Sequence, residues 1–424
     1  MKVSSLGGKR VHERNLIAIA AVILLTGFSA VWASTGKFDS YLLLSLGLMI
    51  LVWFTAHYLI RRFSSGDAFI FPLALTLSAI GLIAICRLKP ALLGNQLLWN
   101  ALGIAAYICS AYFFRRLDSF ADYKYLIGIL GVGLLLSAIL FGVEIGGNKN
   151  WVVLGAVRFQ PSEFAKLLIV IFLAAYLADR REIFAYSTRR LGPFKLPPLR
   201  VAAPLLTLWG ITMMMLIVQR DLGSALLYFA TALGMMYVAS SRLSYVIMGL
   251  ILFFIGSLLC YYFFPHVQIR IDIWLNPWSD PTGRAYQVVQ SLFALGSGGM
   301  IGSGLGYGFP GLIPEVHTDF IFAAIGEELG FVASGAVLMV YMMLLSRFFR
   351  AALQAETFFR KLTLSGLAIF IGLQVLIIIG GVTKFLPLTG VTLPFVSYGG
   401  SSLVSSYILL GIFSANSDSG ESYG

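Results

Sequence analysis

The chain has 424 residues, of which 58% are hydrophobic and 12% charged, and its formal net charge is +11. Soluble domains carry about 25% charged residues, so this composition excludes an ordinary soluble protein and indicates a polytopic membrane protein. In such a protein a positive charge is first a sign of topology, and we expect no nucleic-acid partner. The three cysteines lie far apart in sequence and suggest neither a disulfide framework nor a metal cluster.

Apolar segments long enough to cross a membrane, about 20 residues each, recur along the chain. The expected fold is therefore all-α, a polytopic membrane protein of about twelve transmembrane helices. The expected spans are Leu16–Ala33, Tyr41–Ile60, Ala68–Cys86, Leu97–Phe114, Tyr123–Phe141, Glu163–Leu177, Val201–Val218, Leu222–Val238, Leu243–Phe264, Phe320–Leu345, Phe359–Ile379 and Ser401–Phe413.

The distribution of Lys and Arg predicts the orientation, because these residues favour the cytoplasmic side. With both termini in the cytoplasm, 20 of the 30 fall in inside segments, 9 fall in outside loops and Lys166 lies within a span. We therefore expect a multi-pass protein of the cell inner (cytoplasmic) membrane with both ends inside. The long segment Phe264–Phe322 then lies outside the cell.

This outside loop is the longest break between two spans, and a loop of that length is functional or disordered. Its content of aromatic and aliphatic residues argues against disorder. The Gly-rich run Gly296–Gly308 lets backbone approach backbone or a ligand closely. The amphipathic piece Arg284–Leu295 is expected to lie along the membrane surface.

Charges also gather where the segment Gly146–Lys166 enters a span. Pro161 suits the first turn of a helix, and Glu163 and Lys166, three residues apart, face the same side of that helix. One interpretation is an interfacial salt bridge. The other is a cavity lining, because ionisable groups inside a span are costly and commonly face a cavity.

Three further places carry polar groups at or near membrane depth. Arg220 and Asp221 stand in the tight outside turn Gln219–Gly223 and could simply pair with each other. Thr383–Ser402 is rich in Pro and Gly, and non-helical backbone at this depth is tolerated only against protein or a water-filled cavity. Glu327 and Glu328 are adjacent on a helix, so we expect one to cap or pair and the other to face the cavity.

Taken together, these segments resemble the SEDS family (shape, elongation, division and sporulation), the group of FtsW, RodA and SpoVE. Their order along the chain is the family's order. The matching motifs are NKNWVVLGAVRFQPSEFAKL, QRDLGSAL, WSDPTGRAYQVVQSLFALGSGGMIGSGLG, EVHTDFIFAAIGEELGF and GVTLPFVSYGGSSL.

The resemblance implies a domain organisation. Residues 68–413 would form the family's ten-helix core, with a catalytic outside loop at 265–319 and a cytoplasmic tail at 414–424. Residues 1–67, a cytoplasmic tail and two extra helices, are a departure from that core. A second departure is Arg220, which stands where many members have proline.

The resemblance also implies an activity. Members are peptidoglycan glycosyltransferases that polymerise lipid II, an undecaprenyl-diphosphate-linked disaccharide peptide, on the outer face of the cytoplasmic membrane. They serve cell elongation, division or sporulation. Their implied partners are a class B penicillin-binding protein, which is a transpeptidase, and other elongasome or divisome membrane proteins.

The chemistry needs a carboxylate that takes a proton from the attacking sugar hydroxyl and positive charge near the leaving diphosphate. A single displacement inverts the anomeric centre and requires one base. Asp280 matches the family's catalytic aspartate, although an aspartate before Pro281 can also cap a helix. Lys166 and Arg158 match positions that line the family's cavity and would suit the diphosphate, while Glu163 would hold Lys166 or act on the acceptor.

The same motifs supply the remaining residues expected to bind substrate. These further substrate-binding candidates are Arg220, Asp221, Gln287, Ser291, His317, Asp319 and Ser397.

A divalent cation, Mg²⁺ or Mn²⁺, could bridge diphosphate oxygens to a carboxylate, although no metal-ligand spacing shows one.

Two other functions fit part of this pattern. A lipid II flippase would also use a polar cavity containing Glu163 and Lys166, but it has no evident need for the outside carboxylate of Asp280. A non-catalytic scaffold for the penicillin-binding protein would not need the cavity charges. Polymerisation of labelled lipid II by the purified protein separates these alternatives.

Overall fold

The computed structural model describes residues 2–36, 40–62, 66–145, 148–155, 157–186, 189–191 and 194–417. The described residues form two compact units. Unit 1 comprises Met1–Arg115, Ile269–Arg347 and Gln374–Gly424, and unit 2 comprises Arg116–Gln268 and Phe348–Leu373.

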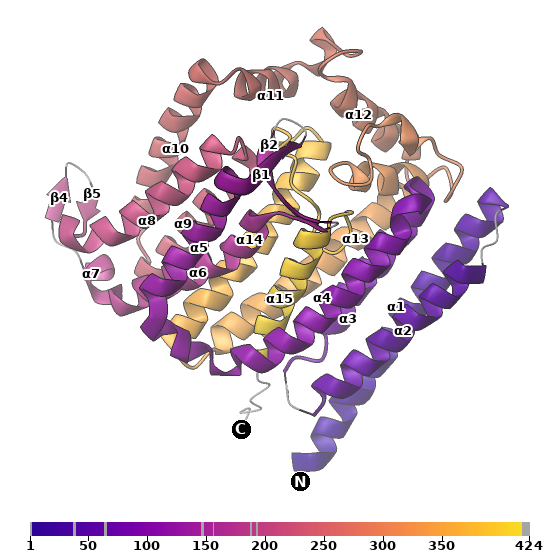
Figure 1. Cartoon of the computed structure of the whole chain (residues 1–424), viewed down its shortest axis with the longest axis horizontal. Helices are drawn as coiled ribbons and strands as arrows, with labels where there is room; N and C mark the ends of the chain where they lie inside the picture. Colours follow the sequence, from indigo (N-terminus) through magenta and orange to yellow (C-terminus); the bar gives the residue numbers. More distant parts are fainter. Residues whose placement is uncertain are drawn as a thin grey trace. The chain divides into compact units, whose positions relative to one another are not determined.

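Twelve long helices correspond to the twelve expected spans, so the prediction of an all-α membrane fold is confirmed (Figure 1). They are α1 (Lys2–Thr35), α2 (Ser40–Ile60), α3 (Ile70–Leu88), α4 (Leu93–Phe113), α5 (Lys124–Phe141), α6 (Pro161–Asp179), α8 (Leu199–Val218), α9 (Leu222–Ser240), α10 (Leu243–Phe263), α13 (Ile321–Gln354), α14 (Phe358–Val382) and α15 (Gly400–Asn416).

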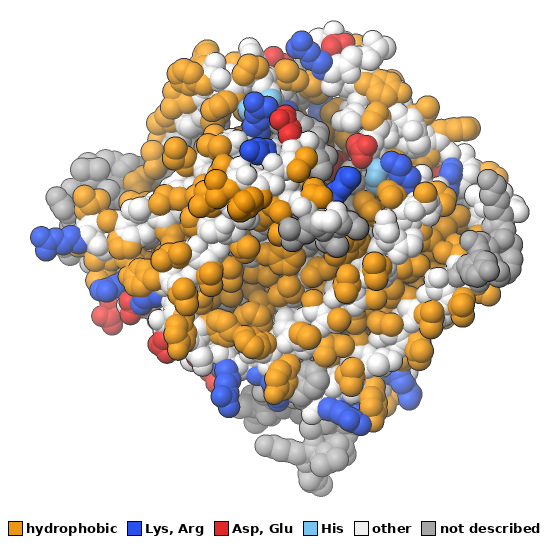
Figure 2. Space-filling view, in the orientation of Figure 1, with side chains coloured by type: hydrophobic (Ala, Val, Ile, Leu, Met, Phe, Trp, Pro, Cys, Tyr) orange, Lys and Arg blue, Asp and Glu red, His pale blue; other side chains and the backbone are white. Residues whose placement is uncertain are grey.

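Ten stretches of the described chain are long and apolar enough to cross a membrane. One of them, Pro90–Phe141, contains both α4 and α5, and α15 has only 17 residues. Hydrophobic side chains dominate the face drawn in Figure 2, and most side chains of α8 and α10 are not buried within the protein. A surface of this kind suits contact with lipid chains.

Shorter elements connect these helices. The sequence predicted none of the strands, which form a three-stranded antiparallel sheet in the order β1-β2-β3 and a two-stranded sheet β4-β5. The short elements are β1 (Gly142–Ile145), β2 (Asn148–Leu154), β3 (Val157–Phe159), α7 (Arg181–Tyr186), β4 (Arg189–Leu191), β5 (Phe194–Leu196), α11 (Pro265–Leu275), α12 (Tyr286–Gly298), and the 3₁₀ turns Pro90–Leu92, Phe114–Tyr123, Pro277–Ser279 and Pro310–Leu312.

In unit 1, α4 packs closely on α15 because glycines remove side chains at the contact. A Cβ on Gly103 would lie 2.3 Å from the Tyr407 ring, and one on Gly411 would lie 1.9 Å from the Ser110 hydroxyl. The buried Tyr407 hydroxyl also donates to Asn100 Oδ1 at 3.2 Å. Close packing and internal hydrogen bonds of this kind replace the hydrophobic effect between helices in lipid.

The Gly-rich run Gly296–Gly308 lies against α13, so that here backbone approaches backbone, one of the two alternatives open from the sequence. The amide of Ser303 donates to the Glu327 carbonyl and the amide of Gly304 to the Glu328 carbonyl, both at 2.9 Å. The helix breaks at Gly330, whose φ of 77° favours glycine. Amides of the loop therefore donate hydrogen bonds to carbonyl groups of α13 near this break.

The side chains of Glu327 and Glu328 fix the same loop. The Arg87 guanidinium donates to Glu328 Oε1 at 2.9 Å and to the Gly308 carbonyl at 3.0 Å. Glu327 Oε1 accepts a hydrogen bond from the Phe309 amide at 2.7 Å. Glu327 therefore caps a loop amide, and Glu328 pairs with Arg87 while it lines a cavity of about 210 Å³. This division agrees with the expectation that one acid caps or pairs and the other faces a cavity.

The orientation of the helices in the membrane gives a first testable prediction. We expect a cysteine placed at Ser297 to lie outside the cell and one placed at Glu356 to lie inside, because Lys and Arg divide 20 to 9 between the two sides. Both positions are exposed, with 86% of the Glu356 side chain accessible.

The measurement is labelling of whole cells with a membrane-impermeant thiol reagent, in a protein whose three native cysteines have been replaced. The cysteine at 297 should be labelled in intact cells. The cysteine at 356 should be labelled only after the cells are permeabilised. The reverse pattern would contradict the orientation.

Candidate active site

In unit 2, Asp221 is the centre of a buried hydrogen-bond cluster. Its side chain is the N-cap of α9, where Oδ1 accepts from the Ser224 amide at 3.0 Å and Oδ2 from the Ser224 hydroxyl at 2.9 Å. Asn150 of β2 and Gln160, the residue before α6, each donate to Oδ2 at 3.1 Å. A carboxylate offers about four acceptor sites, so the hydrogen-bonding capacity of Asp221 is filled.

Arg220 does not pair with this carboxylate, which corrects one of the two alternatives for the turn. Its guanidinium is 59% exposed and lies 3.9 Å from Glu144 Oε1. The φ of Arg220 is 60°, whereas proline is locked near −65°. The turn therefore has a geometry that a proline at this position could not adopt.

Glu163 and Lys166 form the ion pair that their spacing on α6 predicts. Pro161 begins the helix, Glu163 lies in its first turn, and the Lys166 Nζ donates to Glu163 Oε2 at 2.5 Å. Only 2% of the Lys166 side chain is exposed, and its Nζ lies 5.1 Å from the centre of the Phe370 ring. Arg158, by contrast, is an exposed side chain on β3.

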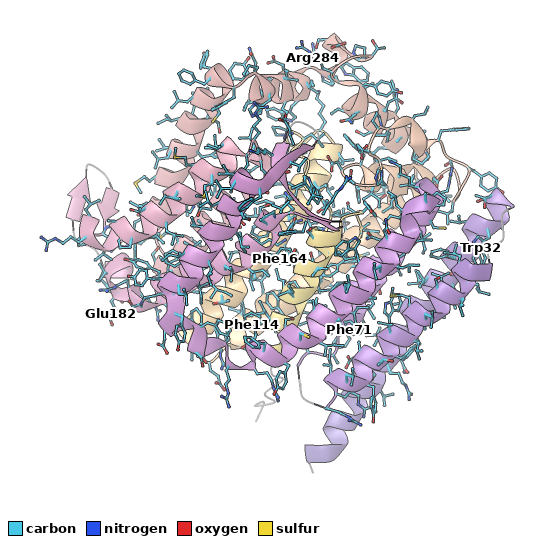
Figure 3. All side chains as sticks on the ribbon, in the orientation of Figure 1. Trp32, Phe71, Phe114, Phe164, Glu182 and Arg284 are labelled. Carbon is cyan, nitrogen blue, oxygen red and sulfur yellow. The ribbon has the colours of Figure 1, made fainter. Side chains whose placement is uncertain are left out.

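Asp280 lies in unit 1, directly after the 3₁₀ turn Pro277–Ser279, and its side chain is exposed. Its Oδ2 accepts one hydrogen bond from the Arg284 amide at 3.0 Å. The carboxylate therefore caps the turn that leads into α12 and keeps further acceptor sites for a ligand. Figure 3 labels Arg284 in this turn.

Gly283 lies against the Asp280 carboxylate. A Cβ at position 283 would lie 2.4 Å from Oδ1 and 2.5 Å from Oδ2, closer than atoms can approach. Glycine at position 283 therefore leaves room for the Asp280 carboxylate.

The remaining candidates of unit 1 differ in what their side chains contact. Ser291 is fully buried, and its hydroxyl donates to the carbonyls of Val288 and Val382. The Ser397 hydroxyl accepts from the Leu393 amide at 3.0 Å and donates to the Thr318 carbonyl at 2.6 Å. Both serines connect separate parts of unit 1.

His317 and Asp319 precede α13. His317 is buried, and burial lowers the pKa of its imidazole; its Nε2 lies 3.7 Å from Glu315 Oε2. Burial raises the pKa of the Asp319 carboxyl to about 6. Desolvation disfavours the charged form of each group, so both side chains are held closer to neutrality than in water.

Gln287 and Asp319 line one cavity of about 230 Å³. Three cations also line it: Arg270, Arg284 and Lys384. From the sequence these three cations count only among the nine positive charges of the expected outside loops. The available signal was that each is a positive charge in a segment assigned to the outside, against the general trend.

The described part of the chain contains no cluster of side chains that could by itself coordinate a divalent cation. There, no three His, Cys, Asp or Glu side chains come together in a way that could hold a metal ion. Structural metal sites take several ligands from the protein. A Mg²⁺ ion that bridges substrate phosphates is usually held by only one or two protein carboxylates, so the expected divalent cation stays a prediction.

Comparison with known proteins agrees with the motifs. The family model described as "Cell cycle protein" (FtsW, RodA, SpoVE) matches residues 66–420. The chain is 39% identical to "Peptidoglycan glycosyltransferase RodA" of Mycobacterium tuberculosis H37Rv, over 95% of this chain and 89% of that protein. It is 35% identical to "Stage V sporulation protein E" of Bacillus subtilis, over 75% of this chain and 84% of that protein.

A solved structure is also similar. It is described as "Structural coordination of polymerization and crosslinking by a peptidoglycan synthase complex", and one of its chains is 28% identical with a TM-score of 0.69, covering 83% of this chain and 97% of that one. On the family model and these relatives, the chain belongs to the FtsW, RodA and SpoVE family of cell cycle proteins, the SEDS family.

Proposed function

We propose that this protein polymerises lipid II into glycan strands on the outer face of the cytoplasmic membrane, with Asp280 as general base. The chain is a peptidoglycan glycosyltransferase, the activity by which its mycobacterial relative is named. The observation that supports the choice of base is the contrast between two carboxylates: Asp280 is exposed and accepts one hydrogen bond, whereas Asp221 is buried and accepts four.

In the proposed reaction the 4-hydroxyl oxygen of one sugar forms a bond to the anomeric carbon of the other. The bond from that carbon to the lipid diphosphate breaks, and the hydroxyl proton passes to the Asp280 carboxylate. One displacement inverts the centre and uses one base. Because the diphosphate leaves as an anion, nearby positive charge stabilises the transition state.

Glu163 and Lys166 are proposed to act in unit 2 as a fixed ion pair, together with the exposed Arg158. The hydrogen bond to Glu163 holds the Lys166 ammonium in one position, which suits contact with a diphosphate or an acceptor sugar. In the same proposal Arg220, Gln287, His317 and Asp319 contact substrate, while Asp221, Ser291 and Ser397 hold their surroundings in place.

A class B penicillin-binding protein is the proposed partner. The similar solved structure is described as a peptidoglycan synthase complex that coordinates polymerisation and crosslinking. A transpeptidase would crosslink the strands that this chain makes. The relatives are named for RodA and for a sporulation stage. The process that this protein is proposed to serve is therefore cell elongation, division or sporulation.

The decisive experiment is polymerisation of labelled lipid II by the purified protein, alone and with its cognate transpeptidase. Glycan strands are the expected product. Movement of lipid II across vesicle membranes without polymer would instead favour a flippase.

Asp280→Asn is expected to abolish polymerisation while expression and partner binding are kept. The change is nearly isosteric, and loss of a general base typically lowers the rate by about 10²–10⁴. Asp272→Asn, in the same outside loop, is the matched control and should polymerise as the wild type does. More than a tenth of the wild-type rate in Asp280→Asn, with Asp221→Asn or Glu315→Gln inactive, would show that another carboxylate is the base.

Gly283→Ala is expected to lower the rate by roughly 10- to 100-fold, because displacement of a catalytic group by about 1 Å can cost 10²-fold. The added methyl group must move the Asp280 carboxylate, which is the free end of an exposed side chain. The melting temperature should therefore stay near that of the wild type. Full activity would mean that the position of this carboxylate does not limit the reaction.

The Glu163–Lys166 pair can be tested for chemistry and for stability separately. Lys166→Met should lower both the melting temperature and turnover, because it leaves the Glu163 carboxylate without its partner. The double variant Glu163→Gln, Lys166→Met should recover the melting temperature but not turnover. Recovery of both would leave the pair with a structural role only.

A further inference from the structure

We infer that the cavity lined by Arg270, Arg284 and Lys384 binds the diphosphate of the leaving lipid in this reaction. The inference rests on the proposed function, and it assigns the leaving diphosphate to residues of unit 1. The cavity has a volume of about 230 Å³. This is smaller than the 300–1,000 Å³ of typical ligand pockets, so it suits a compact anionic group rather than a whole disaccharide peptide.

The charge of the cavity selects an anion. Three cations and one carboxylate, that of Asp319, line it. Within the described residues, no carboxylate lies within ion-pair distance of Arg284 or Lys384. The apolar part of the lining, which includes Trp274 and Leu388, lowers the local dielectric constant and strengthens the attraction of a bound anion to these cations.

The cavity is held open by bonds between its walls. The Arg270 guanidinium of α11 donates to the Thr389 carbonyl at 3.1 Å, and the Trp274 indole donates to the Lys384 carbonyl at 3.3 Å. Lys384 itself has a φ of 62°, a conformation that is uncommon for a residue other than glycine and is found at ligand-binding positions. The cations are thus positioned before an anion arrives, as electrostatic stabilisation requires.

Arg284 connects this cavity to the base. Its backbone amide donates to Asp280 Oδ2 at 3.0 Å, and its side chain lines the cavity. An inverting displacement needs a base for the attacking hydroxyl and positive charge for the leaving diphosphate. Asp280 and Arg284 belong to one turn and so bring the proposed base and one cation of the cavity to the same part of unit 1. This is why we assign the leaving diphosphate to the cavity.

Binding of farnesyl diphosphate to the detergent-purified full-length protein tests the site without any turnover. Arg284→Gln and Lys384→Gln should each weaken binding about tenfold, because each removes a charged hydrogen-bond donor. Farnesol should not compete, and inorganic diphosphate should. Arg270 is left unchanged because its guanidinium also holds the Thr389 carbonyl.

Two further variants make the test specific. Lys89→Gln removes one positive charge from an exposed position of unit 1 outside the cavity and should leave binding unchanged. Asp319→Asn removes the one negative charge of the cavity and should tighten binding severalfold at pH 7.5. Equal weakening by Lys89→Gln, or weakening by Asp319→Asn, would overturn the assignment.

The outcomes separate this inference from the proposed function. If the wild type polymerises lipid II but Arg284→Gln and Lys384→Gln bind farnesyl diphosphate normally, the cavity is not the diphosphate site and the function stands. If binding falls in both variants but the wild type makes no polymer, the site stands and the proposed function fails.

Discussion

A buried charged group needs an ion pair or hydrogen bonds to replace water, and this constraint separates the charged residues of the chain into two kinds. Lys166 is paired by Glu163, and Glu328 by Arg87. Each of these pairs fixes an element: the first turns of α6 in one case and the Gly-rich loop in the other. Because such pairs are costly to break, they provide a rigid frame. The exposed Asp280, with one hydrogen bond of its own, is free to act on a ligand.

The sequence supports the prediction of the helices because each span is a long apolar segment whose pattern is local. It also predicts the Glu163–Lys166 pair, since residues three apart on a helix are neighbours. The cavity of unit 1 could not be predicted in this way. Its cations come from α11, from the turn before α12 and from the segment after α14, and no local pattern brings these segments together.

Asp221 illustrates the same limit at the scale of one side chain. From the sequence it was a candidate beside Arg220, with a possible bond to that neighbour as the alternative. Its actual partners include Asn150, which lies 71 positions earlier in the chain, on a strand that the apolar pattern did not reveal. Whether a carboxylate is available to a ligand depends on such distant donors, so the difference in exposure and hydrogen bonding between Asp221 and Asp280 could be seen only in the folded chain.

The break in α13 at Gly330 has a consequence for how the outside loop moves. The Ser303 and Gly304 amides of the loop donate hydrogen bonds to the Glu327 and Glu328 carbonyls of the helix. In the other direction, the Phe331 amide donates to the Gly299 carbonyl at 2.9 Å. The loop and the helix thus share one set of backbone hydrogen bonds across the break. Despite the many glycines of this stretch, we expect the amides of Ser303 and Gly304 to exchange with solvent only when the adjoining part of α13 opens.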